Sequence, residues 1–319
     1  MALAIMSSGG DAPGMNPAIK KFVDYTYKLG EEPFLIYDGL EGLIDNKIKP
    51  ATHIDVAGIL HRGGTIVRSS RSKRFFEYEY RKQAYENLKA HGITGLVVLG
   101  GDGSFRAMER FSSEFKLNFV GIPSTIDNDI YGTDYCLGVD TALNVIRDAL
   151  DKIRDTASSF NRAFLIEVMG RDCGYLAIVS AMISGAEICV IPETQFDYEK
   201  VGKRLQKEVK DGRNYALAIV SEGTNQTGEV HKWLQDTIGL ETRVSILGHI
   251  QRGGNPTVRD RLMAFAFTIA AVDHLLSHNN SNKVVVHQHG EFKLMEIQEV
   301  VSNKYQLPQK YLDALKLLD

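Results

Sequence analysis

Short apolar runs alternate with longer amphipathic segments along the whole 319-residue chain. Short apolar runs bounded by turn residues are typical of buried strands, and apolar residues that recur every three or four positions are typical of helices packed on one face. The predicted strands are Ala2–Met6, Pro33–Tyr37, Gly95–Leu99, Phe119–Ile122, Ala163–Val168, Ile188–Ile191, Ala216–Val220, Val244–Leu247 and Lys283–His287. The predicted helices include Asn16–Leu29, Tyr78–His91, Thr141–Thr156, Tyr198–Lys210 and Val258–Leu276.

The alternation of strands and helices predicts an α/β fold with largely parallel sheets covered by helices on both faces. The chain is longer than the size at which one hydrophobic core usually stops growing, so two lobes are expected. We expect the first lobe to comprise residues 1–138 and 251–301, and the second to comprise residues 139–250 and 302–319.

Composition restricts the partners. Acidic and basic residues are mixed along the chain, the net charge is -3, and 44% of residues are hydrophobic. No basic segment indicates binding to nucleic acid or to an anionic membrane, and no apolar segment is long enough to span a bilayer. Three cysteines at no metal-like spacing indicate thiols in a reducing compartment, so we expect a cytoplasmic protein.

Polar and glycine-rich segments follow several predicted strands. In open parallel sheets, ligands bind beyond the carboxyl ends of the strands. The segments that follow strands here are Ser8–Gly14, Gly100–Ser104, Pro123–Asp129, Met169–Arg171 and Ser221–Gly223. Five such segments indicate a binding site at these strand ends.

The segment Gly100–Ser104 has the composition of a phosphate-binding loop. Glycines allow a close approach of the backbone to a phosphate, and the helix predicted after Ser104 would present its positive end. Asp102 could hold Mg²⁺, which prefers one or two carboxylates together with phosphate oxygens. A simple tight turn is the alternative, and the loop alone does not choose between kinases of nucleotides, lipids or sugars.

Two carboxylates occur in one turn at Asp127 and Asp129, with an amide between them and Thr125 before them. One carboxylate could accept the proton of an attacking hydroxyl, and the other could help to hold a metal. An Asx-turn stabilised by local hydrogen bonds is the alternative. Arg171, after another strand, could stabilise the negative charge of a phosphoryl group in transfer.

Several further arginines indicate an anionic ligand. Arg252 suits a bidentate contact with a phosphate ester, and His249 can donate to the same group. Arg162 and Arg243 adjoin strands. For any one of them, a salt bridge with a nearby carboxylate is the alternative.

The motifs, taken together and in order, resemble those of bacterial-type ATP-dependent 6-phosphofructokinases. They are Ser8–Asn16, Gly100–Ser104, Thr125–Ile130, Met169–Arg171, Ser221–Gly223 and Leu247–Pro256, and they cover essentially the whole chain. The resemblance implies two Rossmann-like three-layer lobes, a homotetramer, and transfer of the γ-phosphoryl group of ATP, with Mg²⁺, to D-fructose 6-phosphate in glycolysis.

The same resemblance implies roles for individual residues. Asp127 is similar to the base that takes the proton of the sugar 1-hydroxyl, with Arg171 and Thr125 as its catalytic partners, and Asp102 is similar to the Mg²⁺ site. ATP contacts are implied at Gly10, Arg71, Ser72, Gly101, Asp102, Gly103 and Ser104. Sugar-phosphate contacts are implied at Thr125, Asp127, Asp129, Met169, Gly170, Arg171, Glu222, His249 and Arg252, and from a neighbouring subunit at Arg162 and Arg243.

Some positions bear on the donor and on regulation. Gly103 and Ser124 stand where related pyrophosphate-dependent enzymes typically have Asp and Lys, which favours ATP. Leu40 stands where many members have an aromatic residue near adenine.

Arg154, Glu187 and Arg213 match the family's effector site and Lys20 is a conservative replacement, but Asp24 and Asp211 occupy positions that are normally basic. We therefore expect weak or absent control by ADP and phosphoenolpyruvate.

Two alternatives stay open at this stage. One is a pyrophosphate-dependent or other sugar-phosphate kinase of the same superfamily. The other is a non-catalytic sugar-phosphate-binding regulatory subunit, although such a protein would usually have lost Asp102 or Asp127.

Overall fold

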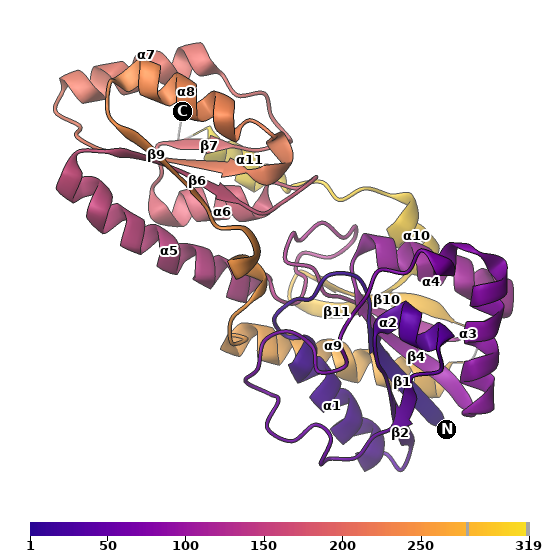
Figure 1. Ribbon diagram of the computed structural model, residues 1–319. Coiled ribbons are helices and arrows are strands. Elements are labelled where there is room, and N and C mark those ends of the chain that lie inside the picture. The colour runs from indigo at the N-terminus through magenta and orange to yellow at the C-terminus, as the bar shows by residue number, and fades with distance from the viewer. Residues whose placement is uncertain (279–280, 317–319) are drawn as a thin grey trace. The chain divides into compact units, whose positions relative to one another are not determined.

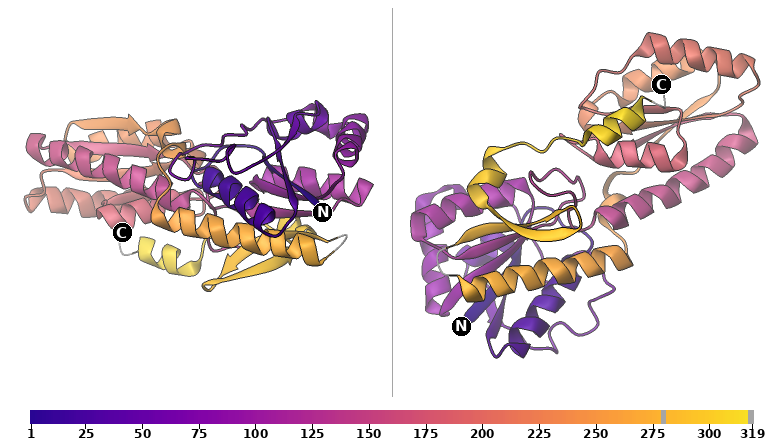
Figure 2. Two further views of the ribbon diagram at one scale, coloured as in Figure 1. Left: turned by 90° about the horizontal axis from the view of Figure 1, so that it is seen from below. Right: turned by 180° about the vertical axis from the view of Figure 1, so that it is seen from behind.

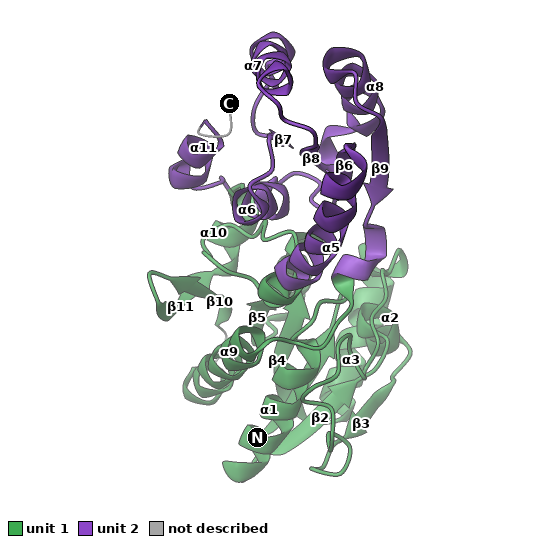
Figure 3. Cartoon of the chain, turned by 90° about the vertical axis from the view of Figure 1, so that its left-hand side faces the viewer, with its two compact units in different colours: residues 1–141, 252–305 green, residues 142–251, 306–319 purple. Residues whose placement is uncertain are grey.

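The computed structural model describes residues 1–278 and 281–316, which form two compact units (Figure 3). Unit 1 comprises residues 1–141 and 252–305, and unit 2 comprises residues 142–251 and the described part of 306–319. The lobe boundaries expected from the sequence lie up to four residues from these. Among the described helices, none is long and apolar enough to cross a membrane.

Unit 1 contains a seven-stranded sheet in the order β11-β10-β5-β4-β1-β2-β3. Its five central strands are parallel: β1 (Ala2–Ser7), β2 (Glu32–Ile36), β4 (Ile93–Gly100), β5 (Phe119–Pro123) and β10 (Asn282–Gln288). The edge strands β3 (Ile48–Pro50) and β11 (Glu291–Glu296) are antiparallel to their neighbours. All six residues of β1 are buried, as expected for a strand covered on both faces.

Helices cover the sheet of unit 1, and α1 (Met15–Lys28) lies beside α9 (Val258–Ser277) (Figures 1 and 2). Buried residues recur every three or four positions along α1, at Ile19, Phe22, Val23 and Thr26, as expected for a helix with one face in the core. The remaining helical elements of the unit are α2 (Gly39–Ile44), η1 (Arg74–Phe76), α3 (Tyr78–Ala90), α4 (Asp102–Phe115) and α10 (Ile297–Ser302).

The order of the strands creates a switch point between β1 and β4. From β1 the chain passes to β2 on one side, and it later returns to place β4 on the other side. In open α/β sheets, ligands bind at such a switch point, beyond the carboxyl ends of the strands.

Unit 2 contains a four-stranded parallel sheet in the order β7-β8-β6-β9. Its strands are β6 (Ala163–Val168), β7 (Ile188–Val190), β8 (Ala216–Ser221) and β9 (Thr242–Ile246). Its helices are α6 (Tyr175–Ser184), α7 (Tyr198–Lys210), α8 (Thr227–Ile238) and α11 (Gln309–Leu315), with η2 (Glu222–Thr224); the bounds of α5 (Val139–Phe160) and η3 (Gly248–Arg252) cross from one unit to the other.

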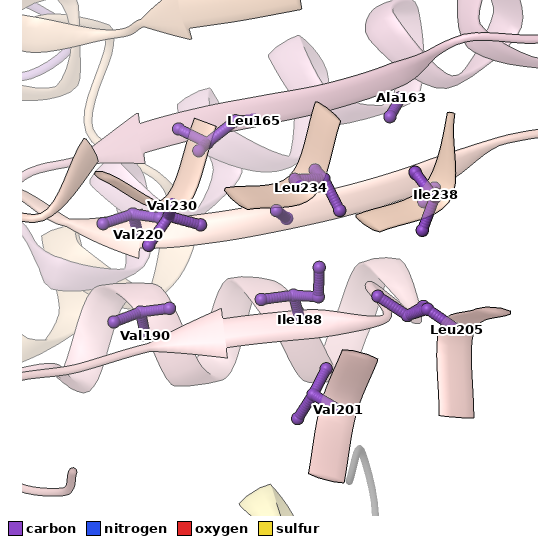
Figure 4. Close-up of a cluster of buried hydrophobic side chains, with 12 residues drawn as sticks. Ala163, Leu165, Ile188, Val190, Val201, Leu205, Val220, Val230, Leu234 and Ile238 are labelled. Atoms are coloured by element: carbon purple, nitrogen blue, oxygen red, sulfur yellow. The ribbon is translucent and has the colours of Figure 1, made fainter. Parts of the chain in front are cut away.

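A buried apolar cluster joins the sheet of unit 2 to α7 and α8 (Figure 4). Leu165 and Val220 from the strands, Leu205 from α7 and Leu234 from α8 are each fully buried or nearly so. This packing fixes β6 and β8 in the core of the unit, and residues assigned to the site directly follow both strands.

The α/β fold with mostly parallel sheets is confirmed. All nine predicted strands are present with ends within two residues of the prediction, and the helices agree similarly, except that α5 continues four residues further, to Phe160. Two expectations were wrong in detail: α4 begins at Asp102 and not after Ser104, and Arg243 lies within β9. The edge strands β3 and β11 were not predicted; β3 has only three residues, and β11 is mostly exposed.

Candidate active site

The carboxyl ends of β1, β4 and β5 bring three of the predicted segments together in unit 1. The Ser8 N–H donates to the carbonyl of Leu99 (2.8 Å), and the Ser124 N–H donates to the carbonyl of Gly100 (2.9 Å). A β-carbon on Gly101 would lie only 3.6 Å from Cβ of Thr125. The glycine-rich loop after β4 therefore lies directly beside the carboxylate turn after β5.

The segment Gly100–Ser104 is shaped by close backbone packing. A β-carbon on Gly100 would lie 2.7 Å from Cβ of Ser104, so no larger residue fits there. Gly101 caps α4 without a side-chain hydrogen bond, and a β-carbon on Gly103 would meet nothing within 4 Å. The loop thus combines an open surface with the positive end of a 14-residue helix, which suits a phosphate.

Asp102 is the first residue of α4, and its side chain is 43% exposed. Its carboxylate accepts a hydrogen bond from Nε of Arg106, one helical turn away (2.8 Å). The described residues contain no group of three His, Cys, Asp or Glu side chains that could hold a metal. An accessible carboxylate beside a phosphate loop nevertheless fits Mg²⁺, because this ion takes few protein ligands and completes its shell with water and phosphate oxygens.

The carboxylate turn is held by its own side chains. The N–H of Asp127 donates to Oγ1 of Thr125 (3.3 Å), and Asn128 adopts a left-handed conformation with φ 54°. Asp127 is only 7% exposed. The turn therefore presents two carboxyl groups from a well-defined backbone.

Asp129 has a perturbed pKa. Burial, and then the charges on Asp127 and Asp102, raise the pKa of its carboxyl group to about 6, although hydrogen bonds from its own backbone and from Thr125 act in the opposite direction. Its Oδ1 is buried without a hydrogen-bond partner among the described residues. Three carboxyl groups thus influence one another in this part of the site, an arrangement typical of functional sites.

The other residues of unit 1 assigned to the site differ in their surroundings. Nη1 of Arg252 donates to the carbonyl of Asp11 (3.2 Å), and a β-carbon on Gly10 would lie 2.8 Å from the same Nη1. Arg71 is exposed, and the hydroxyl of Ser72 accepts a hydrogen bond from the N–H of Phe75 (3.1 Å). Leu40 is 5% exposed and belongs to the core, so its side chain presents almost no surface to a nucleotide.

In unit 2, residues assigned to the sugar phosphate follow β6, β8 and β9. Gly170 has φ 128°, and its carbonyl accepts hydrogen bonds from Oγ of Ser221 (2.7 Å) and from the N–H of Gly223 (2.9 Å). The Met169 N–H donates to Oε1 of Gln251 (3.1 Å). These bonds bring Met169–Arg171 next to η2, which begins with Glu222.

Arg171 and His249 are exposed at this carboxyl edge of the unit 2 sheet. The joint placement of Arg171 with Asp102 and Asp127 of unit 1 stays a prediction.

Arg162 and Arg243 lie at the amino ends of the unit 2 strands, opposite the carboxyl ends that bear Met169–Arg171. Arg162 precedes β6, and Arg243 is the second residue of the parallel strand β9. Both pair with Glu241, Nε of Arg162 at 2.7 Å from a carboxylate oxygen. β6 spans six residues, so roughly 20 Å separates this edge from Met169–Arg171.

Four of the six residues matched to an effector site, Lys20, Asp24, Glu187 and Arg213, form local ion pairs. In unit 1, Asp24 lies 2.9 Å from Nζ of Lys20 and 2.8 Å from Nδ1 of His53. In unit 2, Arg213 forms ion pairs with Glu187 and Glu208, the latter at 2.8 Å. Arg154 is half-buried, and Asp211 is exposed at the end of α7.

The sequence analysis missed two ion-pair partners of assigned residues: Arg106, which pairs with Asp102, and His53, which pairs with Asp24. The spacing of four residues between Asp102 and Arg106 on one helix could have indicated their ion pair. His53 lies in an irregular segment 29 residues from Asp24, and no local pattern connects them.

The fold and the site are those of an α/β phosphotransferase, since a glycine-rich loop at the start of a helix, an exposed carboxylate and a buried carboxylate turn lie side by side at the carboxyl ends of β4 and β5. A family model described as phosphofructokinase matches residues 2–275. The chain therefore belongs to the phosphofructokinase family.

Individual relatives agree with this assignment. A Sulfurimonas denitrificans protein named ATP-dependent 6-phosphofructokinase is 56% identical over 98% of both chains. The structure of phosphofructokinase from Saccharomyces cerevisiae matches the whole chain with a TM-score of 0.91 and 33% identity, although this chain spans only 47% of the yeast chain. A pyrophosphate-dependent phosphofructokinase from Marinobacter aquaeolei, 20% identical, shares the fold with a TM-score of 0.81 over 99% of this chain and 91% of that one.

Proposed function

We propose that this protein phosphorylates D-fructose 6-phosphate with ATP to give fructose 1,6-bisphosphate, a reaction of glycolysis. The observation that carries the proposal is the position of the Asp127–Asp129 turn beside the phosphate loop Gly100–Ser104. The name of the relative with 56% identity supports the same activity.

Residues of unit 1 hold the donor and start the reaction. The backbone of Gly101 and Gly103, the hydroxyl of Ser104 and the positive end of α4 bind the phosphates of ATP. Gly10, Arg71 and Ser72 complete the nucleotide contacts. Asp102 would hold Mg²⁺, which would supply positive charge to offset that of the phosphate oxygens.

Asp127 takes the proton from the 1-hydroxyl of the sugar. The sugar oxygen then forms its bond to the γ-phosphorus while the bond to the bridging oxygen of ATP breaks, and ADP leaves. Thr125 supports Asp127, because its Oγ1 accepts a hydrogen bond from the N–H of Asp127. Asp129 and Arg171 bind the sugar and the transferring group, and Arg171 offsets its negative charge.

The sugar phosphate is bound by Met169, Gly170, Glu222, His249 and Arg252, which follow strands or lie in the segment after β9. Arg162 and Arg243 are about 20 Å from the carboxyl edge of their own unit's sheet. At this distance they cannot contact a sugar phosphate bound there, which supports their proposed action on the site of a neighbouring subunit. On this proposal, an isolated subunit has an incomplete site.

A homotetramer supplies that neighbour. The strand β9 forms an edge of its sheet, and Val244, Ile246 and Ile250 in and after it are 39%, 64% and 57% exposed. An edge strand with exposed apolar side chains is suited to contact with another chain. We place the enzyme in the cytoplasm, where glycolytic sugar phosphates and ATP are available.

One assay separates the donors. Purified protein is given fructose 6-phosphate and Mg²⁺ with either ATP or pyrophosphate, and fructose 1,6-bisphosphate is measured. Product with ATP alone supports the proposal, and product with pyrophosphate alone supports the alternative donor, with which the fold is compatible. Tight binding of fructose 6-phosphate without turnover with either donor would indicate a regulatory subunit.

A further inference from the structure

Asn128 lies between the two carboxylates of the catalytic turn and is completely buried. Its left-handed backbone, with φ 54°, is a conformation that Asn tolerates better than most residues. This residue changes the direction of the chain between Asp127 and Asp129, so its conformation sets the relative orientation of the two carboxyl groups.

Both ends of the Asn128 amide are bonded to the segment that follows the turn. Oδ1 accepts a hydrogen bond from the N–H of Cys136 (2.8 Å), and Nδ2 donates to the carbonyl of Asp134 (3.2 Å). One partner is a donor and the other an acceptor, so only a neutral amide in this orientation satisfies both. An aspartate would place a negative oxygen against the carbonyl of Asp134.

The segment bonded to Asn128, residues 132–136, is itself fixed to the hairpin formed by β10 and β11. The N–H of Asp134 donates to the carbonyl of His287 (2.7 Å), and its carboxylate accepts from the N–H of His289 (2.8 Å). Nε2 of Gln288 donates to the carbonyl of Gly132 (2.8 Å). A continuous series of hydrogen bonds therefore runs from the edge of the sheet to the catalytic turn.

We propose that Asn128 is a positioning residue, which holds Asp127 and Asp129 in their reactive orientation by linking the turn to residues 132–136 and the β10–β11 hairpin. The inference rests on the proposed role of Asp127. Because a displacement of about 1 Å at a reacting group can reduce the rate about 100-fold, a small rotation of this turn is sufficient to impair catalysis.

The experiment compares Asn128→Asp and Asn128→Gly with the wild type. Asn128→Gly keeps the left-handed backbone accessible and removes the amide. Asn128→Asp keeps the shape and the acceptor for Cys136, but replaces the donor and adds a charge between two carboxyl groups. Both variants should lower kcat about 10- to 100-fold with a smaller change in KM for fructose 6-phosphate. Asn128→Asp should also move the acidic limb of the kcat–pH profile to higher pH, since a nearby negative charge raises carboxyl pKa values.

A matched control is available in Asn118, which is also buried and bonds through both ends of its amide. Its Nδ2 donates to the carbonyl of His278 (3.1 Å), and its Oδ1 accepts from the N–H of Ser281 (3.4 Å). Asn118 precedes β5 and Asn128 follows it, so the control lies at the opposite end of that strand from the carboxylates. Asn118→Asp should lower the Tm without changing kcat or its pH profile.

The outcomes separate the inference from the function. Normal kcat and an unchanged pH profile in both folded Asn128 variants would overturn the positioning role, and so would equal effects of Asn118→Asp and Asn128→Asp on kcat. If the wild type itself makes no product while Asn128 variants change only the Tm, the proposed function fails instead. Intrinsic fluorescence and Tm measurements establish that each variant is folded before its kinetics are compared.

Discussion

Asp127 and Asp129 occupy one turn of the backbone, and burial together with the charge on Asp127 raises the pKa of the Asp129 carboxyl group to about 6. An ordinary Asp in the unfolded chain has a pKa near 3.9. Between these two pH values the folded protein retains a proton that the unfolded protein releases. Stability from this group is therefore fully present below about pH 4 and is lost as the pH rises through 6.

Asp129→Asn should remove this pH dependence. At pH 8 the variant should be more stable than the wild type, by on the order of 2 kcal/mol, because it avoids an ionised buried carboxylate. At pH 4 the two proteins should have similar stability. Denaturant unfolding at both pH values, without nucleotide or metal, measures the difference; a constant offset at the two pH values contradicts the assignment.

The open space at Gly103 predicts how the donor is chosen. A β-carbon at this position meets nothing within 4 Å, so Gly103→Asp should fold normally. Its negative charge should nevertheless repel the phosphates of ATP and lower kcat/KM for ATP about 10- to 100-fold, equivalent to roughly 1.4–2.7 kcal/mol. Gly103→Ala is the matched control, because it adds bulk without charge and should have a much smaller effect. Equal losses in both variants would show that size, and not charge, matters here.

The proposed sharing of active sites between subunits predicts complementation. Under that proposal Arg243→Ala lacks a phosphate contact and Asp127→Ser lacks the base, so each variant alone should be nearly inactive at low fructose 6-phosphate. Mixed tetramers, formed by reassembling the two variants together, should regain activity, because some sites combine an intact Asp127 from one subunit with an intact Arg243 from its neighbour. Mixtures that stay as inactive as the separate variants would contradict sharing of Arg243.

The ion pairs of Asp24 predict weak regulation by anions. Burial acts to raise the pKa of Asp24, but hydrogen bonds from Lys20 and His53 outweigh it and lower that pKa, so Asp24 is charged at neutral pH. A phosphate beside this carboxylate is repelled by about 1 kcal/mol or more. The fructose 6-phosphate saturation curve should therefore change little with ADP or phosphoenolpyruvate. A curve that becomes more sigmoidal with phosphoenolpyruvate and less so with ADP would refute this prediction.

The sequence predicted those parts of the molecule that depend on local patterns. Buried strands such as β1 are continuous apolar runs, so the sheet was predicted correctly. The glycines of Gly100–Ser104 identified this segment as a candidate phosphate loop, and its role in binding phosphate stays a prediction. β11 was missed because its exposed residues are mostly polar. The pairing of Arg162 and Arg243 with Glu241, and of His53 with Asp24, depends on chain segments brought together by folding, for which the sequence carries no local signal.

The role of Asp127 as the base is tested most directly by Asp127→Ser. The measurement is kcat for fructose 1,6-bisphosphate formation with ATP and Mg²⁺, alongside calorimetric binding of fructose 6-phosphate. We predict a fall in kcat of about 10²- to 10⁴-fold with binding nearly intact, whereas the exposed Asp236→Ser control in α8 should keep its kcat. A folded Asp127→Ser enzyme with near-normal kcat would contradict the proposed mechanism.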